Sequence, residues 1–116
     1  MTGKAWMRAV FDMVSDFETK VYHACAKIPK GKVATYQDIA IAIGSSRAVR
    51  AVGNALNRNP FPSFRVPCHR VVRSDGHVGG FARGRGEKER LLRGEGVVIS
   101  SGTVDLALFC IKRNCL

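Results

Sequence analysis

Two short helical patterns joined by a tight turn constrain the fold of this 116-residue chain more than any other feature. Thr35 and Asp38 form a capping-box sequence, after which apolar residues recur at helical spacing up to Ile43. Gly44-Ser45-Ser46 then gives a short turn and a fresh N-cap, and a second apolar stripe runs as far as Leu56. Two helices joined this tightly resemble a helix-turn-helix. The expected stripes are Tyr36, Ile39, Ala40 and Ile43 in the first helix, and Val49, Val52, Gly53 and Leu56 in the second.

A further helix is expected before this pair. Ser15-Asp16-Phe17-Glu18 is a capping box, and apolar residues continue at helical spacing to Pro29. Residues 1–14 are either another short helix packed on the core or a plain extension. Because the length suits one modest core, we divide the chain into an N-terminal extension at 1–14 and a single domain at 15–116.

The chain changes character after Asn59-Pro60, since proline ends the preceding helix. Residues 64–72 are expected to pass through the core as an extended segment, and a turn follows at Ser74-Asp75-Gly76. The remaining expected parts are a glycine-rich loop at 79–86, a short helix at 87–93, and a hairpin within 97–106 that would form a wing.

The charge of the chain points to a polyanionic partner. Nineteen Lys and Arg against nine Asp and Glu give a formal net charge of +10. The basic residues are spread along the chain instead of forming one cluster, which favours nucleic acid over an anionic membrane. We expect a fold that is mainly α with a small β hairpin, a winged helix-turn-helix-like DNA-binding domain. Side chains able to contact phosphates and base edges occupy the polar face of the second helix, where a solvated surface is the alternative: Arg47, Arg50, Asn54, Asn57 and Arg58.

Cysteine usage and the absence of a leader pattern set the expected compartment. No apolar run approaches membrane-spanning length, so we expect a cytoplasmic protein, nuclear in a eukaryote, with no membrane partner. The four cysteines are therefore interpreted as thiols. No CxxC pair is present, and adjacent Cys68 and His69 suit two ligands of one metal poorly, so neither a metal nor a cofactor is expected.

The segment around Cys68 is the strongest candidate for chemistry. A thiol reacts as thiolate, which a neighbouring base or positive charge favours, and His69 and Arg70 follow directly. Glu95 is an acid that could orient the histidine through the fold. Taken alone, the Cys-His pair is weak, because a free cysteine is often a small buried apolar residue.

The longer pattern resembles the catalytic domain of O6-alkylguanine-DNA alkyltransferases. Pro67-Cys68-His69-Arg70-Val71 is a specific motif, and Tyr36, Arg50, Gly79 and Glu95 agree in order and approximate spacing. The resemblance runs from about Phe17 to about Gly96. It implies a monomeric DNA repair protein that flips O6-alkylguanine, chiefly O6-methylguanine, out of double-stranded DNA. The alkyl group would pass irreversibly to the cysteine, so each molecule acts once.

The same resemblance implies a role for each matching residue. Cys68 would be the acceptor, His69 a base acting through a water, Glu95 the residue that holds the histidine, and Asn59 a brace between the helix-turn-helix and the thiol segment. Tyr36 would crowd the phosphate of the target nucleotide, and Arg50 would fill the space that the base leaves, with Arg47 and Asn54 as further DNA contacts. The alkylguanine pocket would comprise Tyr36, Val71, Val78, Gly79, Phe81, Ala82 and Arg83.

The chain also departs from this family pattern. The family's N-terminal domain does not precede Phe17, and the interval from Asn59 to Cys68 is one residue longer than usual. Phe81 stands where tyrosine is common, and Ala82 where some members carry serine. Arg83 replaces a glycine of some members, which predicts a narrower pocket and poorer reaction with large adducts such as benzyl.

Two other functions remain open at this level. Alkyltransferase-like proteins bind alkylated DNA on the same scaffold without repairing it, but they typically carry tryptophan at the position of Cys68. A small helix-turn-helix regulator would explain the charge and the second helix of the pair, but not Pro-Cys-His-Arg.

Overall fold

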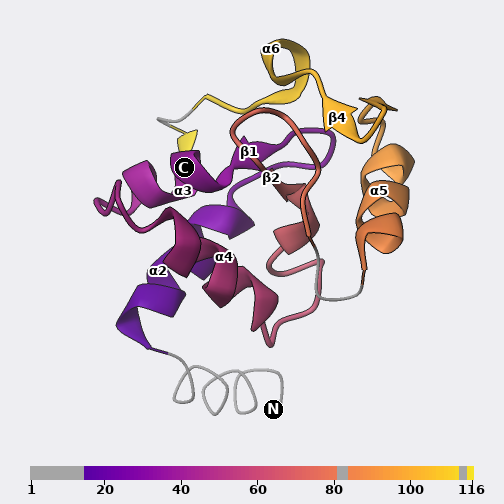
Figure 1. Cartoon of the computed structure of the whole chain (residues 1–116). Helices are drawn as coiled ribbons and strands as arrows, with labels where there is room; N and C mark the ends of the chain where they lie inside the picture. The colour runs from indigo at the N-terminus through magenta and orange to yellow at the C-terminus, as the bar shows by residue number, and fades with distance from the viewer. Residues whose placement is uncertain (1–14, 81–83, 113–114) are drawn as a thin grey trace.

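A computed structural model describes residues 15–80, 84–112 and 115–116 of the chain. The helix considered within 1–14 therefore lies outside the described residues. Figure 1 shows the helices α2, α3 and α4 gathered on one side and α5 on the other, with short strands between them. In chain order the elements are α2 (Asp16–Ala26), β1 (Ala34–Thr35), α3 (Tyr36–Ala42), α4 (Val49–Asn57), η1 (Cys68–Arg70), β2 (Val71–Val72), α5 (Arg85–Gly94), β3 (Ile99–Ser100), β4 (Thr103–Val104) and α6 (Leu106–Phe109).

Helix α2 begins and ends where its sequence predicts. The Ser15 side chain accepts a bond from the Glu18 amide, and the Glu18 carboxylate accepts one from the Ser15 amide, which completes the capping box. The helix stops at Ala26, three residues before Pro29. Its buried face holds Tyr22, whose hydroxyl donates to the carbonyl of Ala55 in α4 over 2.7 Å.

The helix-turn-helix is confirmed, with a correction at the start of its second helix. Thr35 caps α3 through a capping box with Asp38. The expected N-cap within Gly44-Ser45-Ser46 is wrong, because α4 begins at Val49 after Ala48, which makes no side-chain cap. The amide of Ala48 donates to the carbonyl of Ser45 over 2.8 Å, so residues 45–48 form a turn of their own before the helix.

The thiol-bearing segment is not the extended passage expected over 64–72. Residues 63–65 form turns, and Cys68–Arg70 form the 3-10 turn η1. Only Val71–Val72 is a strand, and it pairs in parallel with Ala34–Thr35. This pairing joins segments far apart in sequence, and it places the start of α3 beside the residues that follow the thiol.

The C-terminal elements agree with the expected order but differ in extent. The turn at 74–76 is present. Helix α5 begins at Arg85, so the last residues of the predicted glycine-rich loop belong to the helix. Antiparallel β3 and β4 form the expected hairpin, shortened because α6 takes up residues 106–109. The expected fold class, mainly α with a small hairpin, is confirmed, with the parallel β1–β2 pair as an addition.

The buried residues form two apolar clusters. The first lies among α2, α3 and α4 and extends to Val66 and Val71 of the thiol segment. The second lies under α5 and the hairpin and includes Val78 and Leu92. None of the helices in the described part of the chain combines the length and apolar character needed to cross a membrane.

Candidate active site

Cys68 lies at the edge of the first apolar cluster, next to buried polar side chains. It opens the η1 turn between buried Pro67 and buried His69, and its half-buried side chain packs against the first cluster. Its amide donates to the carbonyl of Val66 over 2.8 Å, which fixes the backbone at the thiol. The cysteines at positions 25, 68, 110 and 115 are thiols, as their pattern predicted.

A histidine, a glutamate and an arginine form one network next to the thiol. His69 Nε2 lies 2.9 Å from Glu95 Oε2, so the structure brings together the histidine and the acid that the sequence suggested as its orienting partner. Arg70 donates from Nε and Nη2 to the same carboxylate over 2.9 and 2.7 Å. Its Nη1 donates to the carbonyl of Ile28 over 2.7 Å. Arg70 therefore joins the thiol segment to residues just after α2 and α5, a role that sequence reasoning missed.

The hydrogen bonds of the His69 ring leave one nitrogen for chemistry. With Nε2 engaged by Glu95, the proton of the neutral ring belongs on Nε2, and Nδ1 becomes the basic atom. Nδ1 is buried and has no hydrogen-bond partner among the described residues. A histidine held in this way can accept a proton through Nδ1.

Burial and charge act against each other in this network. Burial lowers the pKa of His69, although the hydrogen bond to Glu95 works in the opposite direction. Burial alone would raise the pKa of Glu95, but the bonds from Arg70 and His69 together bring it below its ordinary value. The arrangement is therefore a neutral imidazole beside an ionised carboxylate.

A second polar group surrounds Tyr36 at the start of α3. Lys88 of α5 is completely buried, and its Nζ lies 3.3 Å from the Tyr36 hydroxyl and 3.1 Å from the Gly80 carbonyl. Burial lowers the pKa of Lys88 to about 8 and raises that of Tyr36. Sequence reasoning missed Lys88, yet its position four residues before buried Leu92 places it on the inner face of the helix.

Asn59 connects the end of α4 to the thiol segment. Its Nδ2 donates to the carbonyl of Val66 over 3.1 Å, and its Oδ1 accepts from the amide of Phe61 over 2.9 Å. The Val66 carbonyl thus receives both Asn59 and the Cys68 amide. The Asn59 side chain therefore reaches the segment that carries Cys68.

Of the residues expected to touch DNA, Arg47, Arg50 and Asn54 are exposed, whereas Tyr36 is half-buried. Arg50 and Asn54 lie one turn apart on α4. Arg47 is not on the helix face, because it lies in the turn that precedes α4. Arg58, which follows α4, is paired with Glu18 over 2.9 Å.

The expected pocket residues divide between described and undescribed parts of the chain. Val71 and Val78 are completely buried. Gly79 adopts a positive φ of 79°, and a Cβ there would lie 3.8 Å from the Tyr36 hydroxyl, so glycine and tyrosine are neighbours. Phe81, Ala82 and Arg83 lie outside the described residues.

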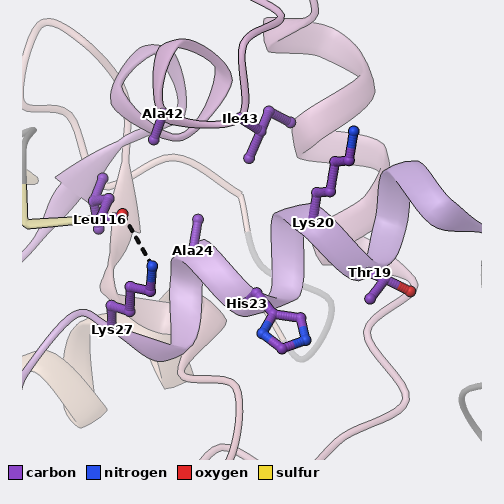
Figure 2. A pocket seen from close by; sticks show the side chains of 8 residues that line it. All are labelled: Thr19, Lys20, His23, Ala24, Lys27, Ala42, Ile43 and Leu116. Carbon is purple, nitrogen blue, oxygen red and sulfur yellow. Dashed lines mark hydrogen bonds between the residues drawn. The ribbon is translucent and has the colours of Figure 1, made fainter.

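Possible metal sites and pockets were also considered among the described residues. No group of three or more His, Cys, Asp or Glu side chains that could hold a metal ion occurs in the described ranges. A hollow of about 340 Å³ between α2, α3 and Leu116, drawn in Figure 2, contains none of the predicted site residues.

Residues 16–97 match the family described as 6-O-methylguanine DNA methyltransferase, DNA binding domain. A methylated-DNA–protein-cysteine methyltransferase of Methanosarcina barkeri is 49% identical over 68% of this chain and 49% of its own length. A bifunctional methyltransferase/endonuclease of Picrophilus torridus is 42% identical over 78% of this chain and 30% of its own. The chain thus spans about half or less of the length of these curated relatives.

Solved structures also resemble the chain. S. pombe Atl1 in complex with damaged DNA containing O6-carboxymethylguanine matches with a TM-score of 0.75 and 34% identity, over 85% of this chain and 97% of its own. The O6-methylguanine-DNA methyltransferase of Pyrococcus kodakaraensis KOD1 matches with a TM-score of 0.66 and 49% identity, over 75% of this chain and 50% of its own.

Proposed function

The chain belongs to the 6-O-methylguanine DNA methyltransferase family, and from this premise we propose that it repairs O6-alkylguanine in double-stranded DNA, chiefly O6-methylguanine. The sulfur of Cys68 attacks the alkyl carbon, the bond from that carbon to O6 breaks, and the guanine leaves with the electron pair. The product is a stable thioether, so the protein acts once and is an acceptor as well as a catalyst.

The observation that carries this proposal is the half-buried Cys68 beside the His69–Glu95 pair. The thiol must lose a proton before it attacks, and Nδ1 of His69 is the basic atom that can take it through a water. Glu95 keeps the proton of the ring on Nε2 and stabilises the imidazolium that forms. Arg70 holds Glu95 in place and remains outside the reaction.

The target nucleotide leaves the duplex to reach a thiol that is partly enclosed. We assign the contacts with the DNA to α4 and to the turn before it, through Arg50, Asn54 and Arg47. Arg50 occupies the space left in the base stack, and Tyr36 crowds the phosphate of the flipped nucleotide. Asn59 keeps α4 at a fixed position relative to Cys68, since the Asn59 side chain and the Cys68 amide both donate to the Val66 carbonyl.

The same reasoning assigns the pocket for the damaged base. Backbone groups near Val71 and Val78 read the guanine edge, and Gly79 leaves room next to the Tyr36 hydroxyl. We also assign Phe81, Ala82 and Arg83 to this pocket, on the family resemblance alone, since they lie outside the described residues. Residues 15–116 carry out this repair as a monomeric unit on DNA, in the cytoplasm or in a eukaryotic nucleus.

The test is a single incubation with two measurements. Native protein is mixed with duplex DNA carrying radiolabelled O6-methylguanine, and both label on the protein and affinity for the lesion are measured. The proposal expects stoichiometric labelling, which Cys68→Ala abolishes while DNA affinity is kept. Selective binding without labelling would identify a lesion-binding protein of the Atl1 kind, and binding without lesion preference would identify a regulator.

A further inference from the structure

The turn just before Cys68 presents an aromatic side chain to solvent. Phe64 is 81% exposed, more than the other large exposed apolar side chains of the described chain, Val98 and Leu108, which are each 65% exposed. A single exposed apolar residue is ordinary on a protein surface, so its setting decides what it means.

The backbone that carries Phe64 is held firmly on both sides. The amides of Arg65 and Val66 both donate to the carbonyl of Pro62, over 2.9 and 3.0 Å. Phe61 is buried, with its ring packed edge-on against Tyr22 at a centroid distance of 5.8 Å. The backbone of the turn is therefore already ordered, so only the exposed Phe64 side chain loses freedom when a partner binds.

A positive charge accompanies the exposed ring. The guanidinium carbon of Arg65 lies 6.0 Å from the centroid of Phe64, within the range of a cation–π contact. Because the guanidinium lies over one face of the ring, the opposite face is the one on which a base stacks, while the cation meets a phosphate.

This turn lies between the two parts of the chain assigned to DNA. Asn59 and the Cys68 amide meet at the Val66 carbonyl, so the turn is attached to the end of α4 on one side and to the thiol on the other.

We propose that Phe64 and Arg65 form a second nucleic-acid contact beside the thiol, in which Phe64 stacks on a base left unpaired by flipping and Arg65 contacts a backbone phosphate. The inference rests on the proposed function, since it takes the unpaired base from the flipping step. DNA is favoured over a protein partner because the net charge is +10 and one aromatic ring offers far less apolar area than a protein interface needs.

Binding is measured in a Cys68→Ser background, which prevents transfer, with Phe64→Ala, Phe64→Tyr and the matched surface control Leu108→Ala. The probes are a duplex with one O6-methylguanine and the same duplex fully paired. Phe64→Ala should weaken binding to the lesion duplex about tenfold and to the paired duplex about twofold, because one stacked base is lost. Phe64→Tyr should bind within about threefold of the parent, and Leu108→Ala should match it. A 5-iodouracil opposite the lesion should photocrosslink to the peptide that contains Phe64.

Equal binding of Phe64→Ala and the parent to both duplexes would overturn the proposal, and so would an equal loss in Leu108→Ala. If Phe64→Ala weakens binding only to the lesion duplex while native protein never gains a methyl group, the Phe64 contact is supported and the proposed repair function is wrong. Native protein and Phe64→Ala should also react at the same rate with free O6-methylguanine, since the thiol chemistry does not involve the turn.

Discussion

An arginine–glutamate pair connects distant elements in each half of the molecule, and the two pairs differ in burial. Arg58 meets Glu18 over 2.9 Å at the surface of the helical half, where the arginine side chain is 65% exposed. Arg70 meets Glu95 over 2.7 Å inside the thiol-bearing half, where the side chains are 16% and 13% exposed. Helices α2 and α4 already meet in the first apolar cluster, so the Arg58–Glu18 pair is an addition to that packing. The half that carries Cys68 also has an apolar cluster, but its thiol segment is joined to residues just after α2 and α5 by buried polar contacts.

Matched substitutions of the two arginines test this contrast, and they give the largest expected effect. Arg70→Ala leaves the buried Glu95 carboxylate with His69 as its remaining bonded side chain and removes the donor to the Ile28 carbonyl, and it should lower the free energy of unfolding by about 3 kcal/mol or more. Arg58→Ala should lower it by less than about 1 kcal/mol, because solvent already screens that pair. Urea unfolding of both variants and the native chain measures the difference. Equal losses in the two variants would break the comparison.

Lys88→Met tests the buried polar contacts further, through the pH dependence of the free energy of unfolding. The pKa of Lys88 is about 8 in the folded chain against 10.5 for the free side chain, so the unfolded chain binds more protons between these values. Stability from this group therefore rises as pH rises through that window, by about 3 kcal/mol in all. The stability of native protein relative to Lys88→Met should increase by about this amount from pH 7 to 10.5. A difference that stays constant with pH would contradict the buried charge.

The titration of His69 gives the smallest expected effect. Burial holds its pKa below 6.5 in the folded chain, so its neutral form persists further into acid and its contribution to stability falls as pH drops below 6.5. An NMR titration of the His69 ring should have its midpoint below 6.5. Glu95→Gln should move the midpoint lower still, because the carboxylate favours the charged ring. A midpoint at or above 6.5 would show that the carboxylate outweighs burial.

The helical half was predictable because its signals are local. The capping boxes at Ser15 and Thr35 each specify a helix start within four residues, and the structure has both. The start of α4 was missed because backbone bonds within 45–48, which leave no trace in composition, displace the helix to Val49.

The thiol-bearing half was predictable only in part, since its contacts join residues far apart in sequence. Cys68, His69 and Glu95 were predicted from the chemistry of a thiol next to a base and from the family resemblance, but only the fold brings His69 and Glu95 together. The parallel pairing of Val71 with Ala34 joins segments separated by three helical elements, and no local pattern encodes it. Lys88 was hidden by the ordinary expectation that lysine is exposed.

Peptide mass spectrometry after reaction with O6-methylguanine DNA tests the central claim most directly, because the chain carries four thiols in different settings. Cys25 is fully buried, and burial raises its pKa, whereas Cys68 is half-buried beside His69. The account predicts one added methyl group per molecule, found on the peptide that contains Cys68. A methyl group on Cys25, Cys110 or Cys115, or none on any cysteine while the DNA remains bound, would contradict it.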